Sequence, residues 1–257
     1  RAWRANGALE GLDLSAVRCF SSTGETSSPD DMTWLMSRAG YPPVIEYCGG
    51  TELGGGYVAG TVIEPHPPST FSTPCFGSDF FILDDAGRPA DEGEVALVPP
   101  MLGSSSRLLN RDHHAVYFEG MPESPDGRPL RRHGDHMRRL PGGVYRALGR
   151  VDDTMNLGGI KVGSAELERV LDRVEGVKAS AAVAVPPPGG GPSQLVVFAV
   201  AEGAPDSLRA AMTKAIAREL NPLFKLADLV LVDALPRTAS GKVMRRVLRE
   251  RYEDEWD

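Results

Sequence analysis

The chain has 257 residues, of which 28 are Lys or Arg and 35 are Asp or Glu, so its formal net charge is −7 at pH 7. This acidic balance argues against nucleic acid as the main partner, because binding to phosphates requires a basic surface. No apolar run approaches the roughly 18 residues that a membrane-spanning helix requires. The 3 cysteines include no C-x-x-C pair and fit neither a disulfide framework nor a structural zinc site. We therefore expect a soluble protein with one large domain or two smaller ones.

The first part of the chain, residues 1–57, predicts alternating strand and helix. A short apolar run at residues 17–22 predicts a strand, and apolar residues at helical spacing predict a helix at residues 29–38. A second strand is predicted at residues 44–48, directly before a glycine turn. This order is typical of the edge of an α/β sheet, in which loops gather at the carboxyl ends of the strands.

The middle of the chain, residues 58–149, is richer in proline and glycine and shows little helical periodicity. Short strands are predicted at residues 80–83, 94–98 and 144–148. Because strands predominate and helical patterns are scarce, we expect a small β-rich subdomain over this part of the chain.

From about residue 149 onward, the pattern predicts a compact α+β domain. Its expected elements are a helix capped by Ser164, strands at 181–185 and 195–200, a helix capped by Asp206 that buries Leu208, Ala211, Met212, Ala215 and Ile216, a strand at 229–232, and a basic helix from about Val243. We place the boundary between the two parts near residues 150–153. The expected fold class is therefore α/β plus α+β.

Two glycine-containing segments follow the predicted strands of the first part. In Tyr47-Cys48-Gly49-Gly50-Thr51-Glu52, the glycines would let the backbone approach a phosphate, the Thr51 hydroxyl could donate to it, and Glu52 could hold a hard divalent cation. An ordinary glycine-rich turn explains this segment equally well. A Walker-type phosphate loop requires a lysine after its glycines, and no lysine follows the segment Ser22-Thr23-Gly24-Glu25. A turn is therefore the simpler interpretation of this segment.

Two further regions carry basic side chains. One region is the segment Gly149-Arg150-Val151-Asp152-Asp153, in which the Arg150 guanidinium could hold two ribose hydroxyls or a phosphate. The segment Gly158-Gly159-Ile160-Lys161 follows it and adds the charge of a lysine. Their paired aspartates fit either a hinge or a charged interdomain linker. The segment Pro236-Arg237-Thr238-Ala239-Ser240-Gly241-Lys242 places a lysine where it could reach an anionic transition state. A solvated basic loop is the alternative.

The order and spacing of these segments resemble the adenylate-forming (AMP-binding) superfamily, which includes acyl-CoA synthetases, luciferases and the adenylation domains of peptide synthetases. The segment VDDTMNLGGIKVGSAELE is most similar to the acetyl-CoA-synthetase-like branch, and GEVALVPPMLGSSSRLLN resembles plant-type acyl-activating enzymes. The resemblance covers essentially the whole chain. It implies that residues 1–150 form the C-terminal part of an AMP-binding N-terminal domain, and that residues 151–257 form a small mobile C-terminal lid.

The resemblance also implies roles for individual residues in binding ATP or AMP, Mg²⁺ and CoA. Those in the first part are the adenine-lining Gly24 and Glu25, the phosphate-contacting Thr51, the Mg²⁺ ligand Glu52 and the ribose-binding Asp135. Those in the second part are Arg150 beside the same ribose, Asp152 as the hinge, Gly159 beside the CoA tunnel, Lys161 near the phosphate, and Lys242 as the catalytic lysine of adenylation.

Three positions depart from the pattern of this superfamily. Cys48 stands where an aromatic side chain usually stacks on adenine, Lys161 stands where arginine is usual, and His133 replaces a common threonine. Arginine can bind a phosphate or carboxylate through two parallel N–H groups, whereas lysine offers a single point charge. The histidines between residues 113 and 136 show no metal-ligand spacing, so we expect them to be solvated.

The function that the resemblance implies is that of an ATP-dependent acyl-CoA synthetase, an acid–thiol ligase of fatty acid metabolism. A small carboxylate would react with ATP to give an acyl-adenylate and pyrophosphate, and CoA would then displace AMP. The superfamily's Ser/Thr/Gly-rich phosphate loop lies far upstream of its Thr-Glu pair, whereas only 50 residues precede Thr51. We therefore expect this chain by itself to be a fragment with little or no activity.

Two other functions stay open from the sequence. One is a truncated, non-catalytic module that binds AMP or CoA or regulates a partner. The other is an adenylation domain that feeds a carrier protein, which is the weaker alternative because no carrier segment follows Asp257. The C-terminal Glu255-Trp256-Asp257 is not a Ser-Lys-Leu-type peroxisomal signal, so the cytoplasm and the peroxisome are both expected compartments.

Overall fold

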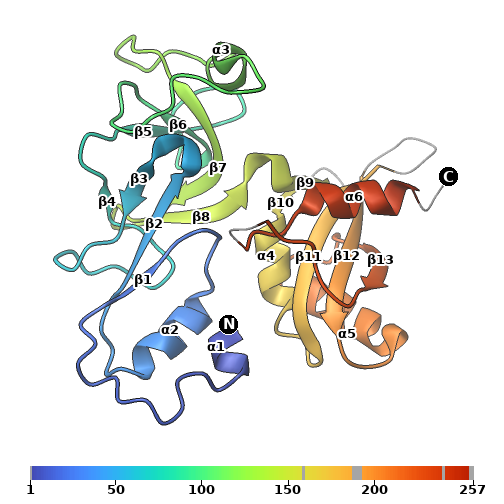
Figure 1. The fold of residues 1–257 in the computed structure, drawn as a ribbon. Coiled ribbons are helices and arrows are strands. Elements are labelled where there is room, and N and C mark those ends of the chain that lie inside the picture. Colours follow the sequence, from blue (N-terminus) through green and yellow to red (C-terminus); the bar gives the residue numbers. More distant parts are fainter. Residues whose placement is uncertain (1, 158–159, 187–192, 239–240, 255–257) are drawn as a thin grey trace. The chain divides into compact units, whose positions relative to one another are not determined.

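The computed structural model describes all residues except 1, 158–159, 187–192, 239–240 and 255–257 (Figure 1). Its internal contacts divide the chain into two compact units, Arg1–Leu148 and Gly149–Asp257. We call these the first unit and the second unit and describe each by itself. None of the helices in the described residues is both long and apolar enough to cross a lipid bilayer.

The first unit begins with a small mixed sheet and two helices. Its elements are α1 (Ala2–Ala5), β1 (Phe20–Ser22), α2 (Pro29–Ser37), β2 (Val44–Gly50), the 3₁₀ helix η1 (Thr51–Leu53), β3 (Gly55–Ala59) and β4 (Thr73–Pro74). The strand order is β1-β2-β3-β4, with β1 parallel to β2 and the other pairs antiparallel. The helix α2 starts with a proline, whose fixed φ suits the first helical position. The strand–helix–strand order predicted for this region is therefore present.

A second sheet of the first unit contains four strands in the order β5-β6-β7-β8. These are β5 (Phe80–Leu83), β6 (Glu92–Leu97), β7 (Arg131–Arg139) and β8 (Tyr145–Arg150), with the short helix α3 (His113–Tyr117) between β6 and β7. The pairs β5–β6 and β6–β7 are antiparallel. The long strand β7 was not predicted, because its sequence RRHGDHMRR has no apolar alternation.

One apolar cluster joins the two sheets of the first unit. Tyr57 and Val58 of β3 pack in it together with Val95 and Leu97 of β6, and all four are fully buried. Burial of such side chains stabilises the fold by roughly 1.5–3 kcal/mol each. The cluster fixes β3, and therefore the end of β2 and η1, against the second sheet.

In the residues that the structure describes, the second unit contains a hairpin, three further strands and three α-helices. Its elements are the 3₁₀ helix η2 (Val151–Asp153), β9 (Thr154–Leu157), β10 (Ile160–Gly163), α4 (Ser164–Leu171), β11 (Val177–Val185), β12 (Gln194–Ala201), α5 (Pro205–Glu219), β13 (Leu226–Leu231) and α6 (Arg245–Asp254). The main sheet has the order β11-β12-β13, with β11 antiparallel and β13 parallel to β12. The predicted helix and strand order is present, and the β9–β10 hairpin is an addition to it.

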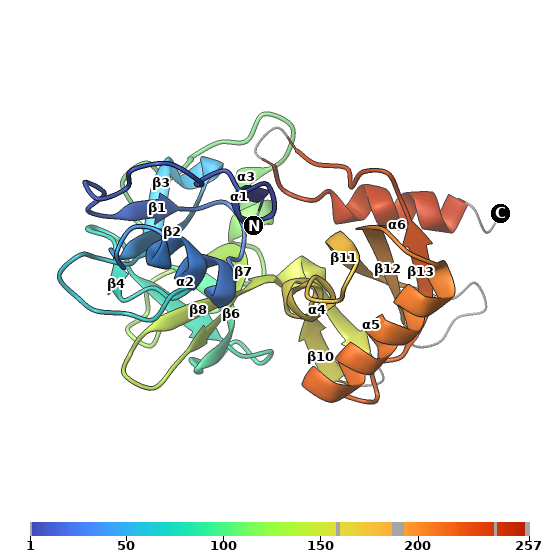
Figure 2. The ribbon, with the colours of Figure 1, turned by 90° about the horizontal axis from the view of Figure 1, so that it is seen from below.

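The main sheet of the second unit is covered on both faces. Alternate residues of β12 point to opposite faces, so Leu195 and Val197 pack with α4 and α5, while Val196 and Phe198 pack with α6. Figure 2 shows α4 and α5 on one side of these strands and α6 on the other. A strand buried on both faces explains the nearly continuous apolar run LVVFAVA.

Both predicted helix caps of the second unit are wrong. The N-cap of α4 is Gly163, and the hydroxyl of Ser164 instead donates to the carbonyl oxygen of Asp153 over 2.9 Å. The N-cap of α5 is Ala204, because Pro205 takes the first helical position, and Asp206 lies in the first turn. Ala211, expected in the core, is exposed.

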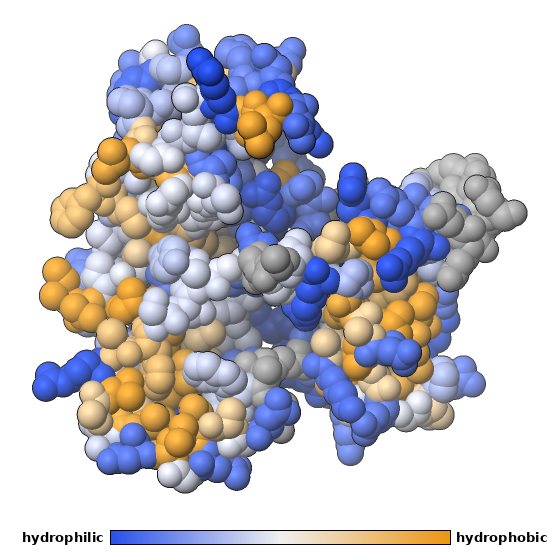
Figure 3. All heavy atoms as spheres, viewed as in Figure 1, coloured by the Kyte–Doolittle hydropathy of each residue, from blue (hydrophilic) through white to orange (hydrophobic). Residues whose placement is uncertain are grey.

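The most exposed apolar side chains of the first unit lie in loops. Those with the largest exposed fractions are Phe76, Leu102 and Leu109. On the face shown in Figure 3, apolar side chains form separate patches between hydrophilic ones on both units. The sheets, in contrast, bury most of their large apolar side chains.

Candidate nucleotide site and lysine loop

The segment that contains Thr51 and Glu52 includes two glycines in close quarters, of which Gly49 faces backbone atoms and Gly50 faces the Glu52 carboxylate. A Cβ atom on Gly49 would collide with the carbonyl oxygen of Gly55, because β2 and β3 approach each other closely there. A Cβ on Gly50 would lie 2.5 Å from Glu52 Oε1. The glycines therefore allow the tight β2–β3 connection that sets the exposed Thr51 and the half-buried Glu52 on η1.

The structure brings Glu52 and Asp135 to opposite sides of one imidazole ring. Nε2 of His133 lies 3.1 Å from Asp135 Oδ2, and Nδ1 of His133 lies 3.7 Å from Glu52 Oε1. The ring packs edge-on against Tyr57, with 4.7 Å between the ring centroids. The His133 side chain is only 1% exposed, so the prediction that this histidine is solvated is wrong.

Tyr57 supports the same cluster from the core. Its hydroxyl donates to Asp135 Oδ2 over 2.9 Å. Burial raises the pKa of Tyr57 well above its ordinary value, and the neighbouring Cys48 and Asp135 add to the shift. The tyrosine therefore stays protonated and acts as a hydrogen-bond donor. Cys48, at the position that usually carries an aromatic side chain, thus lies beside the hydroxyl that holds Asp135.

A buried arginine that the sequence did not single out lies next to this cluster. Arg131 of β7 is 1% exposed, and its guanidinium carbon lies 3.7 Å from the centroid of the Tyr117 ring. Its Nη2 is 3.5 Å from Ser105 Oγ. Burial lowers the pKa of the Arg131 guanidinium, while the neighbouring Tyr117 and Glu52 oppose that shift. The proposed nucleotide residues therefore have a buried cation beside them.

The loop after β1 lies at the same end of the sheet as the end of β2. The Thr23 hydroxyl donates to the carbonyl oxygen of Tyr47 over 2.9 Å. Gly24 has a φ of 112°, which favours glycine, and an added Cβ would meet no atom within 4 Å. Gly24 and Glu25 are exposed. Because β1 and β2 are parallel, their carboxyl ends bring both predicted segments to one edge.

In the second unit, the predicted ribose and hinge residues are neighbours on the surface. Arg150 Nε lies 3.4 Å from Asp152 Oδ1, and both side chains are exposed, so this pair contributes little to stability. Asp152 lies in η2, directly before the β9–β10 hairpin. Lys161 is exposed on β10, whereas Gly159 lies outside the described residues.

Lys242 ends a closed loop that precedes α6. The amide of Thr238 donates to the carbonyl oxygen of Lys242 over 2.8 Å, and the amide of Lys242 donates to Thr238 Oγ1 over 3.1 Å. The amide of Met244 donates to the carbonyl oxygen of Pro236 over 2.8 Å. These bonds close the loop on itself and leave the Lys242 side chain exposed.

The Glu52 carboxylate fits the requirements of Mg²⁺ in a nucleotide complex. Mg²⁺ is usually held by one or two carboxylates together with substrate phosphates, rather than by a cage of protein ligands. Within the described ranges, no group of three or more His, Cys, Asp or Glu side chains has the arrangement of a metal site. One partly exposed carboxylate beside a glycine-rich turn is therefore consistent with a cation that arrives with its nucleotide.

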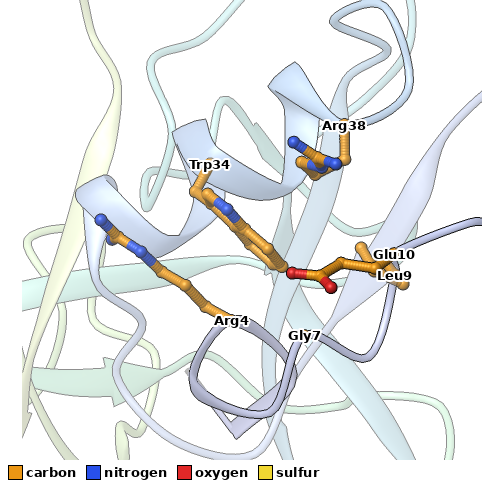
Figure 4. Close-up of a pocket in the computed structure, with 6 residues that line it drawn as sticks. All are labelled: Arg4, Gly7, Leu9, Glu10, Trp34 and Arg38. Atoms are coloured by element: carbon orange, nitrogen blue, oxygen red, sulfur yellow. The ribbon is translucent and has the colours of Figure 1, made fainter.

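A small pocket of the first unit lies among residues with no predicted role. It is lined by Arg4, Gly7, Leu9, Glu10, Trp34 and Arg38 (Figure 4). The ring of Trp34, from α2, lies between the two arginine side chains and is directed toward Glu10. None of these six residues belongs to the clusters described above.

Comparison with known proteins gives a family for part of the chain and relatives for nearly all of it. Residues 166–242 match the AMP-binding enzyme C-terminal domain. The chain is 51% identical over 262 residues to the probable acyl-activating enzyme 17, peroxisomal, of Arabidopsis thaliana, covering 97% of this chain and 36% of that protein. It is 47% identical over 264 residues to the hexanoyl-CoA synthase of Cannabis sativa, and this match covers 98% of this chain and 36% of that protein. The chain thus spans 36% of the length of these two relatives.

Solved structures of CoA-ligating enzymes are similar to the chain as a whole. The acetoacetyl-CoA synthetase from Streptomyces lividans matches with a TM-score of 0.80 and 25% identity, over 96% of this chain and 39% of that one. A benzoate CoA ligase from Burkholderia xenovorans LB400 matches with a TM-score of 0.74 and 25% identity, over 91% of this chain and 46% of that one. The predicted fold class, α/β plus α+β, is confirmed. These matches also confirm that the chain resembles the adenylate-forming superfamily and, within it, the C-terminal region of acyl-activating enzymes and CoA synthetases.

Proposed function

We propose that this chain is part of an ATP-dependent acyl-CoA synthetase, which converts a carboxylate, ATP and CoA into acyl-CoA, AMP and pyrophosphate. The observation that carries the proposal is the cluster of Glu52, His133 and Asp135, in which a candidate cation ligand and a candidate ribose ligand share one buried imidazole. The similarity to acyl-activating enzymes over nearly the whole chain supports it.

In the first half-reaction, a carboxylate oxygen attacks the α-phosphorus of ATP, a new P–O bond forms, and the bond to pyrophosphate breaks. Catalysis of such a step depends on positioning and on stabilisation of the phosphoryl charge. Asp135, held by Tyr57, would accept hydrogen bonds from the ribose hydroxyls. Thr51 would donate to a phosphate oxygen, and Glu52 would hold Mg²⁺, which neutralises charge on the phosphates. Gly24 and Glu25 would line the adenine.

The second unit would supply the mobile cation. Lys242 is exposed on a closed loop, so its ammonium group is available to bridge the carboxylate and α-phosphate oxygens. The second unit would turn about Asp152 between the half-reactions, with Arg150 beside the ribose. In the second half-reaction the CoA thiolate forms the thioester and AMP leaves. Gly159 and Lys161 would face CoA at that stage.

Carboxylate-dependent exchange of pyrophosphate into ATP tests this proposal. The assay uses the full-length protein that contains this chain, with acetate, hexanoate and benzoate as first substrates because proteins similar to this chain carry names for such acids. We expect exchange with at least one carboxylate, and CoA-dependent release of AMP with the same one. Absence of both activities across a wider carboxylate panel would contradict the proposal.

A further inference from the structure

The first residue of α6, Arg245, is half-buried among carboxylates of the second unit. Its Nε and Nη2 donate to the two carboxylate oxygens of Glu168 over 3.0 and 2.7 Å, and its Nη1 donates to Asp153 Oδ2 over 3.1 Å. The Arg245 side chain is 15% exposed. A planar guanidinium that makes three such bonds is held in both position and orientation.

The helix end itself does not favour an arginine. The first turn of α6 contains no acidic residue, and a positive charge at a helix N-terminus opposes the helix dipole. The side chain of the neighbouring Arg246 extends into solvent and is 80% exposed, whereas the Arg245 side chain is 15% exposed and points into the second unit. The two carboxylates therefore account for the position of Arg245.

The carboxylates belong to two separate elements. Glu168 lies on α4 and also accepts a hydrogen bond from the amide of Ala182 on β11 over 2.9 Å. Asp153 ends η2, and its carbonyl oxygen accepts from Ser164 at the start of α4. Burial raises the pKa of both carboxyl groups, and Arg245 opposes the shift in each. One arginine thus joins η2, α4 and α6.

The loop of Lys242 is fixed to the same end of α6. The loop is closed by the hydrogen bond from the amide of Met244 to the carbonyl oxygen of Pro236, and Met244 directly precedes Arg245 in the chain. The amide of Leu248 donates to the carbonyl oxygen of Met244 over 3.3 Å, so the loop continues into the first turn of the helix. The position of Lys242 within the second unit therefore depends on where Arg245 is anchored.

We propose that Arg245 is a positioning residue for Lys242, and that its ion pair with Asp153 fixes the lysine loop relative to η2. This inference rests on the proposed function, in which Lys242 acts in adenylation and Asp152, also in η2, is the hinge. The hinge end and the lysine loop then move as one rigid piece when the second unit turns. Loss of the ion pair misplaces Lys242 in the adenylation step and leaves the thioester step, which does not use Lys242, unaffected.

Three variants of the full-length protein test this role. Asp153→Ala removes the link to η2 and keeps the Arg245–Glu168 fork, whereas Arg245→Lys keeps the charge and removes the fork. Arg246→Lys is the matched control, because it makes the same chemical change one residue further along α6 on an exposed side chain. Each variant is assayed for pyrophosphate exchange and, separately, for thioester formation from a supplied acyl-adenylate, and its thermal unfolding is recorded.

We expect Asp153→Ala and Arg245→Lys to slow pyrophosphate exchange by about 10- to 100-fold, the usual cost of an ångström-scale misplacement. Thioester formation should stay within about twofold of the parent in both, and the Arg246→Lys control should match the parent in both assays. If Arg245→Lys does not fold, Asp153→Ala alone decides the matter.

Equal losses in both half-reactions, or unchanged exchange in a folded Asp153→Ala variant, would overturn the inference. A parent protein that shows no pyrophosphate exchange with any carboxylate would instead contradict the proposed function. The two failures are therefore distinguishable in one set of measurements.

Discussion

The hydroxyl of Tyr57 is the contact that ties the proposed ribose ligand to the core. Because a hydrogen bond to a charged group contributes about 1.5–3 kcal/mol, we expect Tyr57→Phe to lower the free energy of unfolding by about that amount. Tyr145→Phe is the control, because its ring packs in the same core against Phe80 and its hydroxyl makes no hydrogen bond in the described part of the chain. Urea unfolding of the chain measures both variants, and equal losses would contradict the role of the Tyr57 hydroxyl.

Glu46 of β2 predicts a pH dependence of stability. Its side chain is buried, and Oε2 accepts a hydrogen bond from the amide of Ser69 over 2.7 Å. Burial raises the pKa of Glu46 above its ordinary value of 4.5, while Ser27, Ser69 and His66 oppose the shift. The protonated form therefore contributes stability that is complete below pH 4.5 and is lost as the pH rises through the raised pKa.

It follows that Glu46→Gln should be more stable than the parent at pH 7.5, and that this difference should disappear as the pH falls toward 4. The glutamine keeps an oxygen acceptor for the Ser69 amide and carries no buried charge. Urea unfolding at the two pH values measures the effect. A variant that is less stable than the parent at pH 7.5 would contradict this account of the buried carboxylate.

The β2–β3 hairpin offers a test at the level of the element that carries Thr51 and Glu52. In Gly49→Ala the new methyl group would meet the carbonyl oxygen of Gly55, so the strands must separate. We expect a loss of about 1–3 kcal/mol in the free energy of unfolding, as for other overpacked sites. Gly55→Ala, in the same hairpin, meets no atom within 4 Å and should change stability by less than about 0.5 kcal/mol.

Elements with a clear apolar period were predictable from the sequence. The strands β5 and β12 lie at or close to their predicted positions, because one face or both faces of each strand pack on a core. The helix α2 also lies where its apolar spacing predicted it, although none of its residues is fully buried. The strand β7 was missed because its buried positions include Arg131 and His133, which pattern analysis counts as surface residues. The predicted helix starts were wrong because the N-caps of α4 and α5 are Gly163 and Ala204, so that the expected caps Ser164 and Asp206 lie within the first turns of the helices.

Candidate site residues were predictable only as separate segments. The residue pattern singled out Glu52 and the resemblance alone singled out Asp135, but no local pattern shows that β7 carries His133 between them. The same is true of Arg245, whose partners lie 77 and 92 residues away in the sequence. Contacts of this kind depend on how strands and helices meet, so they become visible only in the folded chain.

The whole chain divides into two compact units with distinct proposed tasks. The first unit carries the candidate residues for ribose, phosphate and Mg²⁺, and the second carries Lys242 on its closed loop. Each unit has its own apolar clusters, as expected for parts that could move relative to one another. The central claim is that Lys242 serves one half-reaction only.

Lys242→Ala in the full-length protein tests that claim most directly, with Lys214→Ala, an exposed lysine of α5, as the control. Removal of the ammonium group takes away a cation that stabilises the transition state, so pyrophosphate exchange should fall by about 100-fold or more. Thioester formation from a supplied acyl-adenylate should stay within about twofold of the parent, and the control should match the parent in both assays. Equal loss of the two half-reactions in Lys242→Ala would contradict the account.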